Sequence, residues 1–281
     1  MAKASLWNKT ISYLILCMVG IGLFAPFVYM ISIALASDAT NVKAAFTFIP
    51  KEFAIENFVK VFTNYHLGTY LKNSLIITAW TVVGSVLSAS FVSYGFARLK
   101  ARGSNLLFIV LLSTMMLPSE VTMVPQFIIF KELGWINTFL PLIVPSFFAG
   151  AFNVFLIRQF VMSLPRSLDE AAMIDGMGYF NIYRKIIFPL TMPILSAIAI
   201  FSFAWNWGNF MGPLIYLNDS QKTPLALGVQ LISSVSGGQM PPWNMVMVAS
   251  LFLTIPMILV YTVGQRFVYE ANISGGSSSI K

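Results

Sequence analysis

Long stretches without a charged residue recur along this chain, and they restrict the folds that it can adopt. A helix that crosses a bilayer needs about 20 consecutive apolar residues, because backbone polar groups inside lipid must be satisfied within the helix. Only 10% of the residues are charged, against about 25% in a typical soluble domain. We therefore predict an all-α, polytopic membrane protein. We expect a single transmembrane domain over residues 1–281 with six spans, at about residues 11–36, 73–97, 105–130, 138–157, 189–217 and 244–265.

Basic residues in the connecting loops indicate which side of the membrane holds the termini. Six spans place both termini on one side, and Lys and Arg accumulate in short cytoplasmic loops. The side of the termini holds Lys3, Lys9, Arg98, Lys100, Arg102, Arg158, Arg166, Arg184, Lys185, Arg266 and Lys281. The opposite side holds Lys43, Lys51, Lys60, Lys72, Lys131 and Lys222. We therefore expect both termini, and a polar loop at residues 162–188, in the cytoplasm. Because much of the net charge of +7 is explained in this way, we do not expect nucleic acid as a partner.

A secretory signal peptide is an alternative interpretation of the first apolar stretch. Ala34-Leu35-Ala36 resembles a signal cleavage site. The apolar region of a signal peptide is about 7–15 residues long, whereas the uncharged stretch here covers residues 11–36. We therefore predict a span that stays in the mature protein.

The polar loop at residues 162–188 carries the sequence with the strongest functional signal. Ser167 is a suitable N-cap, and Glu170 three residues later completes a capping box, which predicts a helix over about 168–175. Gly176 fits the left-handed position that ends many helices. Ala171 and Ala172 give this helix a face with little bulk, which could seat closely in a cleft of another protein. The alternative is that Glu170 only caps its own helix. A second helical piece is expected from about residue 179 to residue 189.

The complete loop pattern resembles the EAA signature of ABC importer permeases. The matching residues are Glu170-Ala171-Ala172, then Gly176, Ile186 and Phe188-Pro189, where the signature has Leu in place of Phe188. The resemblance extends over nearly the whole chain and is closest to the shorter permease of the pairs that import maltose, glycerol phosphate and related sugars. Further matching stretches are Asn57-Phe58, Asn73-Ser74-Leu75, Pro118 to Pro125, Leu133 to Thr138 and Gln265-Arg266. One departure lies in the fifth span, where the usual Trp-Asn-Asp-Phe reads Trp207-Gly208-Asn209-Phe210.

The resemblance implies a type I ABC importer permease fold in a bacterial plasma membrane, with the loop acting as a coupling helix. Its coupling residues would be Glu170, Ala171, Ala172, Asp175, Gly176, Ile186 and Pro189. The implied partners are a second, homologous permease, an ATP-binding-cassette ATPase dimer, an extracytoplasmic solute-binding protein and membrane lipid. No Gly-x-x-x-x-Gly-Lys-Ser/Thr occurs in the chain, and that motif is what cradles nucleotide phosphates. We therefore expect no cofactor in this chain, and ATP bound by the partner subunits.

Four polar or aromatic residues inside the predicted spans are candidates for the translocation pathway or for substrate contact. Glu120 is the only ionisable residue of the third span, and a charge at that depth usually faces a cavity or a partner. A continuous helix from Asn105 would place Glu120 in the outer half of the bilayer. Trp205, Asn206 and Asn209 combine aromatic rings with amides, which suit a sugar. The alternatives are a structural hydrogen bond for Glu120 and interfacial anchoring for the neighbouring Trp207.

Other function classes have less support from the residues. With one histidine and one cysteine, the chain has no evident metal cluster or nucleophile with a base, so we do not expect an enzyme. A secondary transporter would need its own coupling-ion site, for which a single buried carboxylate offers little. An ABC importer permease for a non-carbohydrate solute would share the same loop and stays open at this point.

Overall fold

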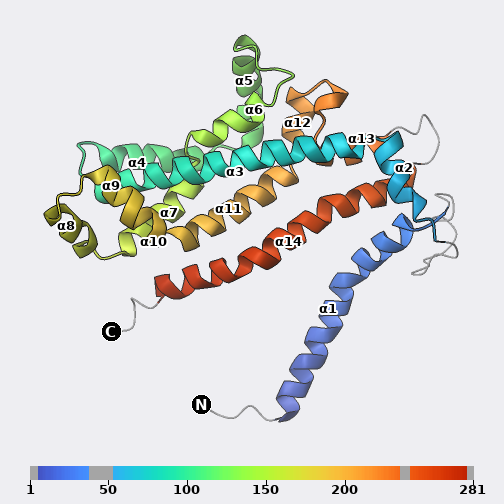
Figure 1. The fold of residues 1–281 in the computed structure, drawn as a ribbon, viewed down its shortest axis with the longest axis horizontal. Coiled ribbons are helices and arrows are strands. Elements are labelled where there is room, and N and C mark those ends of the chain that lie inside the picture. The colour runs from blue at the N-terminus through green and yellow to red at the C-terminus, as the bar shows by residue number, and fades with distance from the viewer. Residues whose placement is uncertain (1–5, 38–52, 235–240, 277–281) are drawn as a thin grey trace. The chain divides into compact units, whose positions relative to one another are not determined.

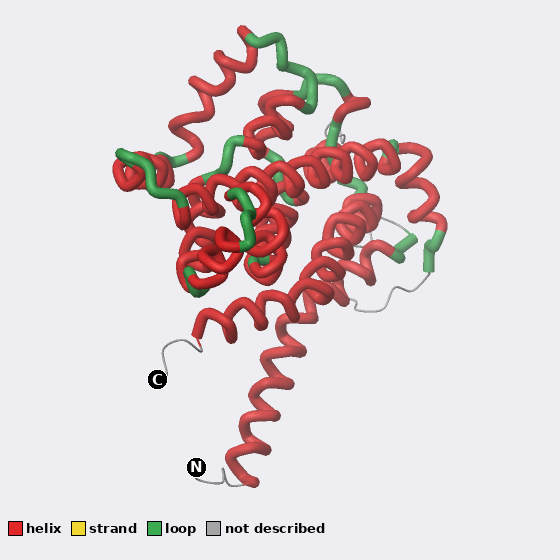
Figure 2. The backbone as a smooth tube through the Cα atoms, turned by 60° about the vertical axis from the view of Figure 1, so that its left-hand side comes forward, coloured by secondary structure: helices red, strands yellow, loops and turns green. Residues whose placement is uncertain are grey.

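The computed structural model describes residues 6–37, 53–234 and 241–276 of the chain (Figure 1). Helices make up the regular secondary structure of these residues (Figure 2), apart from one isolated bridge between Ala36 and Phe53. The all-α prediction is therefore confirmed for this part of the chain. Several residues of the topology argument lie outside the described ranges, namely Lys3, Lys43, Lys51 and Lys281.

The chain divides into two compact units, and the predicted single domain is not tested by this division. One unit holds residues 1–68 and 228–254. Its described helices are α1 (Leu6–Ala34), α2 (Glu56–Asn64), most of α13 (Leu225–Ser234) and the first part of α14 (Trp243–Gly276). Asn57 on α2 is buried, and its Nδ2 donates hydrogen bonds to the carbonyl oxygens of Ala34 (3.0 Å) and Ala36 (2.9 Å). These bonds satisfy the end of α1, where carbonyl groups lack partners within the helix.

The other unit holds residues 69–227 and 255–281 and carries the polar loop. Its principal helices are α3 (Leu67–Arg98), α4 (Ser104–Ser113), α5 (Ser119–Glu132), α6 (Leu140–Ile143), α7 (Ala151–Ser163), α8 (Ser167–Ile174), α9 (Tyr179–Ile182), α10 (Phe188–Leu190), α11 (Met192–Trp207) and α12 (Met211–Tyr216). The rest of α14 belongs to this unit as well.

The apolar helices agree with a protein that crosses the membrane several times. Four segments are long and apolar enough to span a bilayer: Lys9–Ala34, Leu67–Arg98, Leu140–Ser163 and Trp243–Arg266. Two further pairs of helices pass the same test but are bent by 102° and 74°, namely Ser104–Met116 with Ser119–Glu132 and Tyr179–Leu190 with Met192–Trp207. If each bent pair counts as one span, the described residues hold up to six spans.

The break in the third predicted span has a local cause. Leu117 and Pro118 are extended, with ψ angles of 118° and 139°, because a proline disfavours helical geometry in the residue before it. The chain then restarts as α5 after a bend of 102°. The continuous helix assumed from Asn105 to Glu120 is therefore wrong, so its length no longer supports a position of Glu120 in the outer half of the bilayer. Pro125 lies inside α5 without ending it.

Small residues on α3 allow neighbouring segments to approach closely. A Cβ on Gly84 would lie 2.4 Å from Ser146 Oγ and 2.7 Å from the ring of Phe147, so a larger residue would force these side chains to move. Ser88 Oγ donates to the carbonyl oxygen of Ser146 (3.1 Å), and Ser93 Oγ donates to that of Val154 (3.0 Å). These side-chain hydrogen bonds hold the start of α7 and the turn before it against α3.

Candidate functional site

The polar loop begins with α8, and its first turn differs from the predicted capping box. Arg166 stands at the N-cap position with helical backbone angles, and no side chain caps the helix. Ser167 is already inside the helix, so its hydroxyl does not cap it, because capping needs a non-helical N-cap residue. The capping box of Ser167 and Glu170 is therefore wrong. The alternative role for Glu170, as a cap of its own helix, is wrong for the same reason.

The C-terminal end of α8 has the geometry predicted for Gly176. This glycine has φ = +77°, the left-handed region that costs other L-residues energy. Its N–H donates to the carbonyl oxygen of Met173 (3.0 Å), and the N–H of Met177 donates to that of Ala172 (3.0 Å). The two bonds form a Schellman motif. This motif turns the chain sharply out of α8.

One face of α8 is buried and the other is exposed. Ala172 is 2% exposed and belongs to the same core cluster as Ile182 and Ile187. The expectation that Ala171 and Ala172 share a surface that faces a partner is therefore wrong for Ala172, whose side chain packs inside this chain. Glu170 and Ala171 are exposed.

Large apolar side chains within and just after α8 are exposed as well. Ile174 is 86% exposed, Phe180 63%, Tyr179 56% and Met173 44%. With Glu170 and Ala171 these four residues form what we call the loop surface. Asp175, which ends α8, is exposed as well. Isolated exposed apolar residues are normal on proteins, whereas a contiguous group of them indicates an interaction site.

The chain returns from the loop through three short helical pieces. α9 is followed by a π-helical turn (Tyr183–Ile187) and by α10, which agrees with the predicted second helical segment. Within this return, Ile182 and Ile187 are fully buried. Ile186 is half-buried, and Pro189 is exposed in the first turn of α10.

A buried ion pair joins α8 to the end of α3. Arg98 Nε lies 3.1 Å from Asp169 Oδ2, and both side chains are nine-tenths buried or more. Arg98 Nη2 also donates a hydrogen bond to the carbonyl oxygen of Leu164 (2.9 Å). Neither carboxylate oxygen of Asp169 has a well-aligned hydrogen-bond donor, so the contact is an ion pair. It lies on the wall of a cavity of about 310 Å³ that Glu170 and Tyr179 also line.

The sequence interpretation missed this pair. It took Arg98 only as a topology signal and Asp169 only as a helix residue. Asp169 lies three residues before Ala172 and therefore on the same helix face, but only the structure shows that this face is buried. A carboxylate on a buried face requires a partner.

The pathway candidates lie in different surroundings. Glu120 is exposed in the first turn of α5 and accepts a hydrogen bond from Ser119 Oγ (3.0 Å). Trp205 is 76% exposed, whereas Trp207 is 1% exposed and stacks on Phe203. The interfacial anchoring considered for Trp207 is therefore wrong, since its ring is inside the chain.

The side chains of the two asparagines in the fifth predicted span form hydrogen bonds with backbone groups. Asn206 Nδ2 donates to the carbonyl oxygen of Ser202 (2.8 Å). Asn209 Oδ1 accepts a hydrogen bond from the N–H of Gly212 (3.1 Å), and the Asn209 N–H donates to the carbonyl oxygen of Asn206 (3.2 Å). Among the hydrogen bonds of the described residues, none joins Glu120 to this group.

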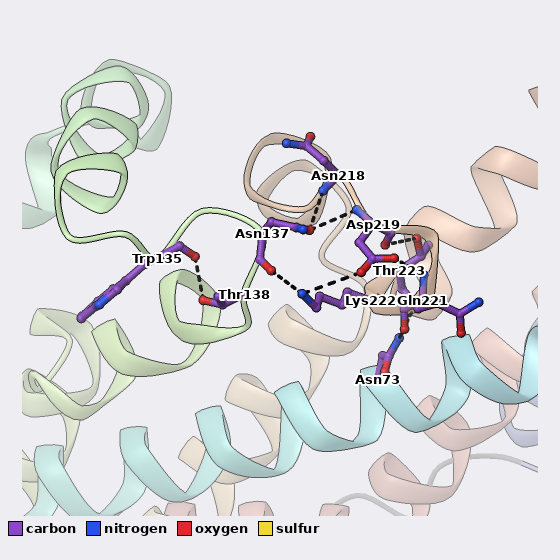
Figure 3. A network of polar contacts seen from close by, with 9 residues as sticks. All are labelled: Asn73, Trp135, Asn137, Thr138, Asn218, Asp219, Gln221, Lys222 and Thr223. Carbon is purple, nitrogen blue, oxygen red and sulfur yellow. Dashed lines mark hydrogen bonds and ion pairs between the residues drawn. The ribbon is translucent and has the colours of Figure 1, made fainter.

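A second set of polar contacts joins α3, the turn before α6 and the segment around η5 (Ser220–Lys222), as Figure 3 shows. Asn137 has φ = +60°, and its Oδ1 accepts hydrogen bonds from the N–H groups of Asn218 (3.2 Å) and Asp219 (3.1 Å). Lys222 Nζ donates to the carbonyl oxygen of Asn137 (2.8 Å). Asn73 Nδ2 donates to two carbonyl oxygens around η5 (2.8 and 3.0 Å). We call this set the polar knot, and it explains structurally why asparagine stands at positions 73 and 137.

Comparisons with known proteins agree with this architecture. The chain is 30% identical to the trehalose/maltose transport system permease protein MalG of Thermococcus litoralis, over 89% of this chain and 90% of that protein. It is 31% identical to the arabinooligosaccharides transport system permease protein AraQ of Halalkalibacterium halodurans, over 82% and 81% of the two chains. Both relatives are named as transport permeases and not as enzymes.

A solved structure has the same fold. It is a bacterial ABC transporter involved in the import of the acidic polysaccharide alginate, and it matches with a TM-score of 0.84 at 21% identity. The match covers 95% of this chain and 100% of that one. The expected ABC importer permease fold is therefore confirmed. Residues 81–271 match the model of one protein family, and this multi-pass membrane protein belongs to that family, the inner membrane components of binding-protein-dependent transport systems.

Proposed function

We propose that this chain is the permease subunit of an ATP-driven importer for a sugar, an oligosaccharide or a sugar derivative. Membership of the family supports the transport role. The relatives named for trehalose/maltose and for arabinooligosaccharides support a carbohydrate over another solute. The importer would consist of this permease, a second homologous permease, a solute-binding protein outside and two ATP-binding subunits inside.

The loop surface carries the mechanism of this proposal. An exposed carboxylate, Glu170, stands beside the small side chain of Ala171, and the same loop exposes the apolar side chains of the loop surface. A surface of this kind suits docking into a cleft that offers a basic residue and an apolar wall. Because the buried face of α8 packs against the core of the chain, a force applied to the loop surface moves the permease instead of unfolding the loop.

The transport cycle follows from this contact. Binding of ATP brings the two ATP-binding subunits together and draws the docked loops with them. The helices convert that movement into outward opening, and hydrolysis resets the permease. This cycle requires the termini and the loop to lie in the cytoplasm, an orientation that the distribution of Lys and Arg supports. In this cycle Asp175, Gly176, Ile186 and Pro189 shape the loop, and Ala172 seats it on the core.

Crosslinking tests the docking step. A cysteine at Ala171 in a Cys17→Ser background should crosslink to the ATP-binding subunit of the assembled transporter. Ala171 is exposed, so this replacement leaves the core intact. A cysteine at Asn218, which is exposed in the polar knot, is the matched control and should react only with reagents supplied from outside the cell.

Two results would overturn the proposal. One is a cysteine at position 171 that crosslinks only to lipid, or that reacts with reagents confined to the exterior. The other concerns the substrate: proteoliposomes with the cognate binding protein should import labelled oligosaccharides, and import of amino acids instead would refute the carbohydrate assignment.

A further inference from the structure

The loop is attached to one side of α3 by a row of directional contacts. Ser90 Oγ lies 2.7 Å from the hydroxyl oxygen of Tyr183, and Tyr94 Oη donates to the carbonyl oxygen of Tyr179 (3.2 Å). Arg98 adds the ion pair with Asp169. Positions 90, 94 and 98 are four residues apart and therefore lie on one face of the helix. This face of α3 holds the beginning, the turn and the return of the loop at once.

Aromatic packing strengthens the same face. The ring of Tyr183 lies edge-on to Phe91, with centroids 5.5 Å apart, and 5.4 Å from the ring of Tyr94. Such pairs prefer defined geometries. Together with the hydrogen bonds, they fix how the loop is oriented on α3 and not merely how close it lies.

The covalent connection from the loop to α11 is weaker by comparison. It passes through the π-helical turn Tyr183–Ile187 and then bends by 74° before α11. Pro189 and Pro193 stand on either side of this bend, and a proline has no N–H for the helix ladder. The loop also shares a core with Leu195 and Ile198 of α11, but apolar contacts are not directional. Thr191 at the bend is hydrogen-bonded to Ile187 and Phe188 on one side and to Leu195 on the other, but a segment bent by 74° transmits a push along its axis less faithfully than the row on α3.

We propose that α3, and not the covalently attached α11, is the helix that moves as one body with the loop, and that Arg98 is the positioning residue that ties the two together. This inference rests on the proposed coupling role of the loop. Arg98 suits the task because its guanidinium reaches both Asp169 on α8 and the carbonyl oxygen of Leu164 at the end of α7. The guanidinium thus joins three segments at the base of the loop.

Distance measurements by electron paramagnetic resonance test which helix follows the loop. One spin label is placed on Asn181 of α9, and the second on either Leu87 of α3 or Phe201 of α11. All three sites are exposed. The measurements use the complete transporter with the Cys17→Ser substitution. Between the nucleotide-free and the ATP-bound states, the distance from Asn181 to Leu87 should stay unchanged and that from Asn181 to Phe201 should shift. The opposite pattern would overturn the inference.

Variants of the ion pair test Arg98 itself. In Arg98→Gln, the number of substrate molecules imported per ATP hydrolysed should fall by at least about fivefold, the lower end of typical coupling effects. Asp169→Asn should do the same, and the double variant should be no worse than either single one. Lys100→Gln removes an exposed charge two residues away and should keep the wild-type ratio.

The ratio of substrate imported to ATP hydrolysed distinguishes a positioning role of the ion pair from simple stabilisation of the fold. If the pair only stabilised the fold, import and hydrolysis would fall together with the amount of assembled complex, and the ratio would not change; that result would refute the role of Arg98. If a variant does not assemble, the spin-label distances measured with Arg98 intact still show whether α3 or α11 moves with the loop. A missing crosslink from position 171 would instead refute the docking proposal on which this one rests.

Discussion

Replacing Gly176 with valine perturbs the geometry of the loop and leaves the six residues of the loop surface in place. A Cβ at this position meets no atom within 4 Å, so the substitution creates no clash. The cost comes from the backbone, because φ is +77° and left-handed geometry costs an L-residue about 1–2 kcal/mol, with β-branched residues at the upper end. That energy shifts the balance between the turned and the opened end of α8 by roughly 5–30-fold.

The assay compares import with ATP hydrolysis in the reconstituted transporter. Gly176→Val should insert and assemble normally but import less substrate per ATP, since a loop with an opened turn absorbs part of the movement. Gly176→Asn should be milder, because asparagine tolerates left-handed geometry.

Two matched controls are available in the same chain. Gly178→Val changes a glycine with φ = −75° and open space around its Cβ, two residues away, and should keep the wild-type ratio. Gly103→Val introduces the same strain outside the loop, at φ = +80°, and should lower stability without changing the ratio. A wild-type ratio in Gly176→Val, or an equal loss in Gly178→Val, would refute the mechanical role of the turn.

Three further predictions concern packing and the pathway. Gly84→Leu should lower the thermal stability by about 1–3 kcal/mol, because it overpacks the contact between α3 and the segment before α7, whereas Gly95→Leu has open space and should have little effect. Asn137→Ala should cost about 1–2 kcal/mol in thermal unfolding, since two backbone N–H groups lose their acceptor, and the aspartate variant should restore most of this loss. Trp207→Ala should lower the free energy of unfolding by about 3–5 kcal/mol, because its ring is buried. Trp205→Ala should leave the melting temperature unchanged. A fall in import by Trp205→Ala at an unchanged melting temperature would place Trp205 on the pathway.

The sequence predicted the parts of this fold that depend on local chemistry. Hydropathy located the apolar segments, because the need for about 20 consecutive apolar residues can be checked directly along the sequence. Gly176 was predicted as the end of α8 because one left-handed residue suffices to make that turn. The extended backbone at Leu117 follows from the proline after it, but the angle of 102° between α4 and α5 is not given by that local rule.

One error at the candidate site has a local cause, and the others arise from contacts between distant parts of the chain. The capping box failed because Arg166, after a proline, already adopts helical angles, which moves the helix start by one residue. The burial of Ala172 depends on Ile182 and Ile187 returning beneath it. Arg98 and Asp169 are too far apart in the sequence for a helical periodicity to connect them. Periodicity shows that a helix has two faces, but not which face its own chain will cover.

The division of α8 into a buried and an exposed face also explains how so short a helix serves a mechanical role. Eight residues are too few to form a stable helix in water, so α8 is helical because Ala172 and Asp169 are fixed from behind and Gly176 closes its end. The same contacts that make it a helix attach it to the permease. A change that loosens them therefore weakens the fold of the loop and its connection to α3 together, whereas a change at Glu170 or Ala171 affects the partner contact alone. Structure and coupling can thus be perturbed separately within a helix of two turns.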